Sequence, residues 1–217
     1  MIFRVWLAGV LLMAAVVLLR PQAAVAESGE LMKILSSQPG DKSGDSATRR
    51  ALIADGRERS HFCAYCHGVD GNSKLPLVPN LAGQNPFYLF EQIERFADGR
   101  RKDYIMTPLA KHFSTENKIA LSIYYANMKP RPRTADADLA LKGKTYYLQK
   151  CVSCHGKDAH GGEQYARLAG QHPQYLRRRI YSMQKATGKV ATVMTRVAMT
   201  LSEKEVEALA AYLSTLP

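Results

Sequence analysis

The apolar residues of this chain recur mainly at the spacing of helix faces. Near the C-terminus, Ser202 and Glu205 form a capping-box pattern. The apolar stripe that follows it has helical periodicity and consists of Val206, Leu209, Tyr212 and Leu213. Ser114 precedes a similar stripe of Ile119, Ile123 and Tyr124, and another helical pattern begins at Ala47. No apolar and polar alternation is long enough to build a sheet, so the pattern predicts an all-α fold.

The N-terminus has the pattern of a secretory signal peptide, which we assign to residues 1–26. Arg4 supplies the positive charge, residues 5–19 are apolar, and Ala24-Val25-Ala26 offers a small-residue cleavage site. An uncleaved anchor helix is the alternative. However, fifteen helical residues span about 22 Å, short of the roughly 30 Å hydrocarbon core. The pattern favours cleavage and a periplasmic mature protein.

Residues 27–46 are rich in turn-forming residues and poor in apolar ones. Such a segment has little to bury, so we expect a mobile extension. Leu31, Ile34 and Leu35 offer an alternative, a short docking turn.

The remainder of the chain repeats itself. Residue pairs 88 apart match, namely Cys63 and Cys151, Met106 and Met194, Ser114 and Ser202, and Tyr124 and Tyr212. Between them, Leu81-Ala82-Gly83-Gln84 recurs 87 residues later as Leu168-Ala169-Gly170-Gln171. Small differences in loop length between duplicated domains produce such slips. We therefore predict a first domain at 47–129, a proline-containing linker at 130–134 and a second domain at 135–217.

A glycine lies at a similar place near the start of each repeat. Gly56 precedes the first cysteine pair, and Gly143 precedes the second. The repeated position suggests a close helix crossing, although a simple helix break is equally allowed by the sequence.

The four cysteines form two copies of one motif, Cys63-Ala64-Tyr65-Cys66-His67 and Cys151-Val152-Ser153-Cys154-His155. This spacing is typical of c-type haem attachment, because thiols one helical turn apart meet the two vinyl groups of one porphyrin and the histidine reaches the iron. A shared zinc usually needs pairs about 15–20 residues apart, and a thioredoxin-like site needs a βαβ setting. Structural disulfides would not require the repeated histidine. The motifs predict two covalently bound c-type haems.

The second axial ligand of each iron is sought among the methionines and histidines. Only Met106 and Met194 occupy matching repeat positions, so we expect them to pair with His67 and His155. The other histidines, His61, His112, His160 and His172, lack histidine partners across the repeat, which favours surface or supporting roles. One site with two histidine ligands remains an alternative.

Composition and charge change this picture little. The chain is 46% hydrophobic and 23% charged, as in ordinary globular proteins. Its formal charge is +11; without Arg4 and Arg20 of the signal peptide, 28 basic and 19 acidic residues leave +9. The excess lies in runs at 100–102, 131–133 and 177–179, which suit solvated faces, propionate neighbours, or steering toward acidic partners or an anionic membrane surface. We expect no nucleic-acid binding.

The chain resembles the cytochrome c4 family over about residues 47–217. The resemblance rests on Cys63-x-x-Cys66-His67-Gly68 with Asp70-Gly71-Asn72, on Pro79-Asn80 before the first Leu-Ala-Gly-Gln block, and on the corresponding second-half pieces. It departs in the long extension and in Lys157-Asp158-Ala159-His160-Gly161-Gly162, which replaces the Asp-Gly-Asn turn. The family implies two small all-α domains about an approximate twofold axis, each with one Met/His haem.

The resemblance also implies electron transfer in the periplasm by a carrier rather than an enzyme. We expect a membrane-bound quinol-oxidising complex or dehydrogenase as donor and a terminal oxidase or reductase as acceptor, with peripheral membrane association left open. One alternative is the dihaem subunit of a periplasmic dehydrogenase, such as a sulfide-oxidising flavocytochrome. Another is a dihaem enzyme with one labile axial ligand.

Overall fold

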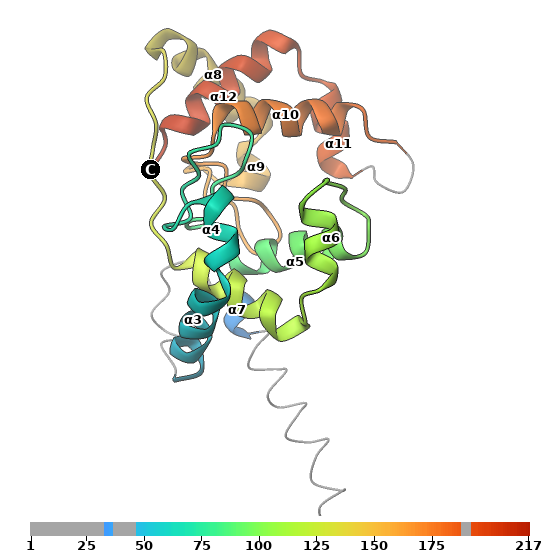
Figure 1. The fold of residues 1–217 in the computed structure, drawn as a ribbon. Helices are drawn as coiled ribbons and strands as arrows, with labels where there is room; N and C mark the ends of the chain where they lie inside the picture. The colour runs from blue at the N-terminus through green and yellow to red at the C-terminus, as the bar shows by residue number, and fades with distance from the viewer. Residues whose placement is uncertain (1–32, 37–46, 188–191) are drawn as a thin grey trace, which may run out of the picture. The chain divides into compact units, whose positions relative to one another are not determined.

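A computed structural model of the chain describes residues 33–36, 47–187 and 192–217. All regular elements within these ranges are helices (Figure 1), as the apolar pattern predicts. The predicted signal peptide and most of the predicted extension lie outside them. None of the helices in the described ranges is both long enough and apolar enough to cross a membrane.

The helices form two successive sets that repeat one order (Figure 1). The first set comprises α3 (Ala47–Arg59), α4 (His61–His67), α5 (Pro86–Ala97), α6 (Met106–Lys111) and α7 (Thr115–Ala126). The second comprises α8 (Ala137–Lys150), α9 (Val152–His155), α10 (Pro173–Gln184), α11 (Val193–Met199) and α12 (Glu203–Thr215). Residues 129–136 between α7 and α8 have no helical turn. The structure is therefore two tandem cytochrome c-like units related by internal duplication.

Local sequence signals fix where these helices begin. Ser202 and Glu205 form the predicted capping box at α12, and the Ser114 side chain accepts a hydrogen bond from the Asn117 amide at α7. Proline lies in the first turn of α5 and of α10, where its missing amide hydrogen costs no helical bond. The helix predicted from Ala47 begins there.

Each half is built on one close helix pair, α3 with α7 and α8 with α12. The predicted apolar stripes face inward: Ile123 and Val206 are completely buried. Gly56 and Gly143 lie where the helices cross, because a Cβ on either would overlap a backbone carbonyl of the partner helix, that of Ala120 or of Ala208. Both glycines continue their helices, so the close crossing is right and the simple break is wrong.

Four residues of the predicted extension, 33–36, are helical. Leu35 is completely buried, and the Ser36 hydroxyl donates a 2.8 Å hydrogen bond to the Glu163 carboxylate of the second half. These contacts agree with the alternative expectation for this segment, a short docking turn. The remainder of residues 27–46 lies outside the described ranges.

The two halves meet through a reciprocal set of hydrogen bonds. The Gln171 side chain accepts from the Asn80 amide at 2.7 Å and donates to the Asn80 carbonyl at 3.0 Å. The Gln84 side chain accepts from the Arg167 amide at 2.7 Å and donates to the Arg167 carbonyl at 2.9 Å. Since Gln84 and Gln171 are the last residues of the repeated Leu-Ala-Gly-Gln blocks, the repeat forms a contact of twofold character between the halves.

Replacing Gly143 by alanine should destabilise the protein although alanine is the better helix former. Alanine gains up to about 1 kcal/mol in helix propensity, but the added methyl group would overlap the Ala208 carbonyl and force α8 and α12 apart. We expect a net loss of about 1–3 kcal/mol in the free energy of unfolding, measured by urea denaturation of the holoprotein. Lys142→Ala, one residue away and exposed, is the control. Equal or greater stability of Gly143→Ala would contradict the crossing.

Replacing Gln171 by alanine should also destabilise the protein, because it leaves both backbone groups of buried Asn80 without their partner. We expect a loss of about 1–3 kcal/mol for each unpaired group. The exposed neighbour Gln174 provides the control, since Gln174→Ala should change the urea midpoint little. Similar midpoints for the two variants would show that the reciprocal contact contributes nothing.

Candidate functional site

In each half, the Cys-x-x-Cys-His motif directly follows the first long helix in the sequence. Cys63, Cys66 and His67 belong to α4. In the second half Cys151 precedes α9, which contains Cys154 and His155, so only the latter part of this motif is helical. The backbone nevertheless turns at once, because the Cys154 and His155 amides both donate to the Cys151 carbonyl. Both motifs therefore present two thiols and a histidine from one turn of chain.

The histidines of both motifs are held in the same way. His67 Nδ1 lies 2.9 Å from the Pro79 carbonyl oxygen, and His155 Nδ1 lies 2.9 Å from the Ala166 carbonyl oxygen. A carbonyl can only accept, so Nδ1 carries the hydrogen and Nε2 keeps its lone pair. Burial lowers the pKa of both imidazoles, which keeps them neutral. Each histidine is thus prepared to bind a metal through Nε2.

The four thiols are unpaired, and one thiol of each motif is buried enough to stay protonated. All four cysteines are free, so none is used in a disulfide. Burial raises the pKa of Cys63, and it raises the pKa of Cys151 to about 11. Thiolates, which zinc binding and thiol exchange require, are disfavoured at such positions. Paired thiols beside a neutral imidazole fit a haem c held by two thioether bonds, with iron at the histidine.

The two matched methionines lie at the starts of equivalent short helices. Met106 is the first residue of α6, and Met194 is the second residue of α11; both are partly buried. Different residues fix these helix starts. The Asp103 carboxylate accepts from the Ile105 and Met106 amides, whereas Thr192 and Thr195 form a capping box at α11. The repeat thus preserves the position of the methionine while changing the residues that support it.

The loop after each motif keeps one shape despite its changed sequence. The Gly71 carbonyl accepts from the Leu81 and Ala82 amides, and the Ala159 carbonyl accepts from the Leu168 and Ala169 amides. Gly71 has φ +71°, and Ala159 adopts a similar left-handed conformation at φ +56°. Alanine pays a steric cost of about 1–2 kcal/mol in this region. The different sequence at 157–162 therefore does not change the turn. The chain after this turn still brings the Ala166 carbonyl to His155.

A cluster of arginine and tyrosine side chains joins the halves beside the first motif. Arg101 donates to the Gln92 side chain at 2.8 Å and to the Tyr175 hydroxyl at 2.9 Å, and its guanidinium lies 4.4 Å from the Phe96 ring centre. Burial, followed by repulsion from Arg101, lowers the pKa of Arg179. The Arg101 charge also helps to lower the pKa of His67, after the larger effect of burial. Arg101 therefore places a positive charge that acts on both Arg179 and His67, and a charge near the motif would favour a haem carboxylate there.

The sequence reasoning did not identify this cluster, although two signals were available. Tyr88 and Tyr175 are equivalent residues of the repeated Pro-x-Tyr-Leu segment. Arg101 and Arg179 belong to two of the basic runs. These runs suggested neighbours of the haem propionates, but the sequence did not show that the two arginines come together. Of the unmatched histidines, His61, His112 and His160 are exposed, whereas buried His172 contacts the Ser73 carbonyl of the first half and the Arg133 side chain.

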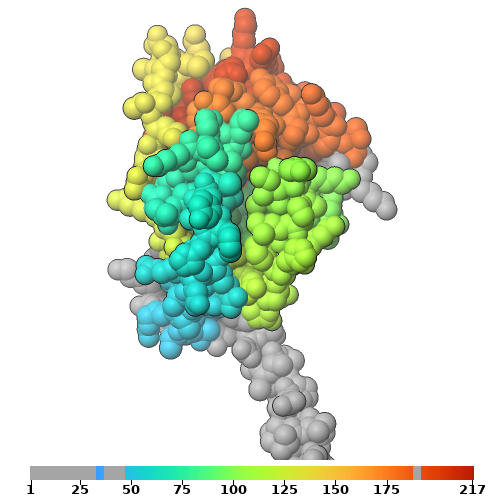
Figure 2. All heavy atoms as spheres, in the orientation of Figure 1, coloured from blue at the N-terminus to red at the C-terminus, as the bar shows by residue number. Residues whose placement is uncertain are grey.

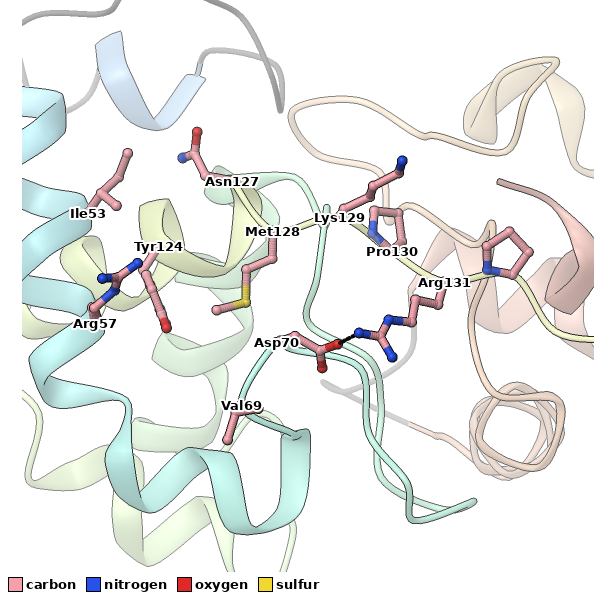
Figure 3. A pocket seen from close by; sticks show the side chains of 11 residues that line it. Ile53, Arg57, Val69, Asp70, Tyr124, Asn127, Met128, Lys129, Pro130 and Arg131 are labelled. Carbon is pink, nitrogen blue, oxygen red and sulfur yellow. Dashed lines mark ion pairs between the residues drawn. The ribbon is translucent and has the colours of Figure 1, made fainter.

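A pocket of about 690 Å³ lies apart from these groups, between α3, the end of α7 and the residues that follow α7 (Figure 3). Met128 lines it together with Tyr124, and an Asp70–Arg131 ion pair of 2.6 Å lies at its side. None of the eight predicted haem-binding residues lines this pocket. Met128 also packs against the hydrophobic core of the first half, as expected of a methionine that fills space in the core.

Comparisons with known proteins agree with this geometry. The family model described as cytochrome c matches residues 140–217. Cytochrome c4 of Thiocapsa roseopersicina is 34% identical over 167 residues, which cover 71% of this chain and 86% of that protein. The thiosulfate dehydrogenase electron acceptor of Thiomonas intermedia is 31% identical, with 71% and 78% covered.

The fold agrees as well. The crystal structure of reduced recombinant cytochrome c4 from Pseudomonas stutzeri matches with a TM-score of 0.70 and 28% identity, covering 76% of this chain and 98% of that one. The arrangement of two attachment motifs on a duplicated helical scaffold is thus shared with these relatives. The chain therefore belongs to the cytochrome c4 family and is an electron-transfer protein with two covalently bound c-type haems.

Proposed function

We propose that His67 with Met106, and His155 with Met194, are the axial ligands of the two irons, while Cys63, Cys66, Cys151 and Cys154 hold the porphyrins. The observation that carries this proposal is the matched pair of histidines, each with Nδ1 bonded to a loop carbonyl and Nε2 free. The methionines support it, because each lies in the first turn of the equivalent short helix of its half.

This ligand set suits an electron carrier. The haem takes up and releases one electron, and the chain holds the imidazole in one tautomer and places charge near it. A thioether ligand favours ferrous iron and so raises the reduction potential. With both axial positions occupied by side chains, a substrate finds no open metal position. This disfavours the alternative of a dihaem enzyme with one labile ligand.

The setting that we propose for this carrier is the periplasm. Residues 1–26 would direct export, and haem-binding domains at 47–129 and 135–217 would be joined by the linker at 130–134. Its donor would be a membrane-bound quinol-oxidising complex or dehydrogenase, and its acceptor a terminal oxidase or reductase. The proposal is supported by the secretory pattern of the N-terminus and by the redox chemistry of the family.

A second candidate is the electron-accepting partner of a periplasmic dehydrogenase. The similarity to the thiosulfate dehydrogenase electron acceptor of Thiomonas intermedia favours it over the flavocytochrome version of this idea. Rapid reduction of the purified protein by thiosulfate dehydrogenase and thiosulfate would support this candidate. No reduction by that couple, together with rapid oxidation by a terminal oxidase, would favour the respiratory carrier.

Absorption spectra with carbon monoxide test the ligands. We expect the native ferrous protein to bind none, because thioethers occupy both sixth positions. Met194→Ala should bind one carbon monoxide per two haems, whereas Met199→Ala, in the same helix but exposed, should bind none. Met106→Ala, with Met128→Ala as control, tests the first half in the same way. Carbon monoxide binding to the native protein would contradict the proposed carrier function and would favour the alternative of a dihaem enzyme with one labile ligand.

Redox titration tests the arginine cluster. A cation stabilises the reduced haem, so Arg101→Gln should lower the potential of the first haem. A unit charge about 10 Å from the iron contributes on the order of 2 kcal/mol at an effective dielectric constant of about 20, which corresponds to tens of millivolts. Neighbouring Arg100 is exposed and paired with Asp98, so Arg100→Gln should change the potential little. Equal potentials for both variants would show that Arg101 does not act on the haem.

A further inference from the structure

Four exposed apolar side chains surround the ligand-bearing elements of the first half. Phe62 and Tyr65 belong to α4 and are 82% and 84% exposed; Tyr104 and Ile105 directly precede Met106 and are 95% and 59% exposed. The segments that carry them are both visible on one face of the molecule (Figure 2). We call these four residues the first-haem surface.

The two rings on α4 point to solvent beside the haem-binding groups. Successive helical residues are rotated by about 100°, so Phe62 lies about 60° from Tyr65 and about 140° from His67, whereas Cys66 lies about 40° from Phe62. His67 is buried and both cysteines are half-buried, while the two rings are exposed. The aromatic rings therefore adjoin the haem attachment on its solvent side.

The second half is a natural control, because duplication gives it the same elements. Phe62, Tyr65, Tyr104 and Ile105 correspond to Lys150, Ser153, Thr192 and Val193. The second motif thus forms without aromatic residues at these positions. Since large exposed rings are unfavourable in water, their concentration at one haem calls for a role outside the fold.

Lysines lie close in sequence to this surface. Lys74, Lys102 and Lys111 are exposed, and within the described part of the chain none of them pairs with a carboxylate. Asp103 is partly exposed, but its carboxylate is engaged by backbone amides and by Arg178. Since Lys102 is two residues from Tyr104, the surface has unpaired positive charge beside its apolar side chains, the complement of an apolar contact area with an acidic rim.

We propose that the first-haem surface is the docking site for an acidic electron-transfer protein, and that the corresponding surface of the second half is not. The proposal rests on the proposed carrier function, to which it adds the chemistry of one partner and the haem that meets it. The aromatic side chains provide the short-range contact, and the lysines speed the encounter at low ionic strength.

Amide NMR shifts of the labelled, reduced holoprotein test this docking, with a flavodoxin as acidic one-electron probe. We expect shifts around residues 62–65 and 102–106, and not around 150–153 or 192–194. The double variant Tyr65→Ser with Tyr104→Thr, which installs second-half residues, should bind the probe about tenfold more weakly. Leu141→Ser with Leu148→Ser removes exposed apolar side chains of the second half and should bind normally.

Phe62→Lys is a second test at a residue outside the Tyr104–Met106 segment, and it should also weaken binding. Shifts centred on the second half, or unchanged affinity in both first-half variants, would overturn the proposal. So would concentration-dependent shifts of the same residues without the probe, which would indicate a second copy, or larger shifts with phosphatidylglycerol vesicles. Haem spectra recorded on the same samples test the axial ligands, so a failure of the carrier function is seen separately.

Discussion

The structure depends on a hydrogen-bonded contact that joins the two halves and orients the histidines of both motifs. Pro79 holds His67 through its carbonyl, and the next residue, Asn80, is bonded through its backbone to Gln171 of the other half. Ala166 and Arg167 repeat this arrangement with His155 and Gln84. Because each histidine-orienting carbonyl is one residue from the interface, a shift of either half would disturb the imidazole of its own motif.

Around this contact, the two halves reach the same geometry with different residues. Gly71 and Ala159 turn the chain in the same left-handed conformation, although only glycine does so without steric cost. Asp103 fixes the start of α6, and a threonine capping box fixes that of α11. The duplication therefore preserves the positions of haem-binding groups more strictly than the residues that hold them.

The sequence was sufficient for local features and insufficient for those that depend on assembly. Capping at Ser202, the inward stripe at Val206 and Leu209, and the all-α class follow from short-range patterns and are confirmed. The glycines at 56 and 143 could not be assigned to a crossing until their partner helices were placed. Nor could the charge run at 100–102 reveal that Arg101 turns inward to Tyr175 while Arg100 stays at the surface. Met106 and Met194 remain predictions, since repeat position alone selects them.

The distribution of charge and apolar surface gives the two halves different parts in electron transfer. The arginine and tyrosine cluster lies between the halves, close enough to the first motif for Arg101 to act on His67. Positive charge placed there favours the reduced haem. At the spacing of 88 that relates Tyr104 to Thr192, Arg101 corresponds to Lys189, which lies outside the described residues. The exposed rings of Phe62, Tyr65 and Tyr104 have no aromatic counterparts at the matching positions of the second half, where Tyr165 is the half-exposed ring beside His155. If the axial ligands are equivalent, any asymmetry between the haems must arise from these surroundings, and a partner docked at the first-haem surface would meet the haem beside Arg101.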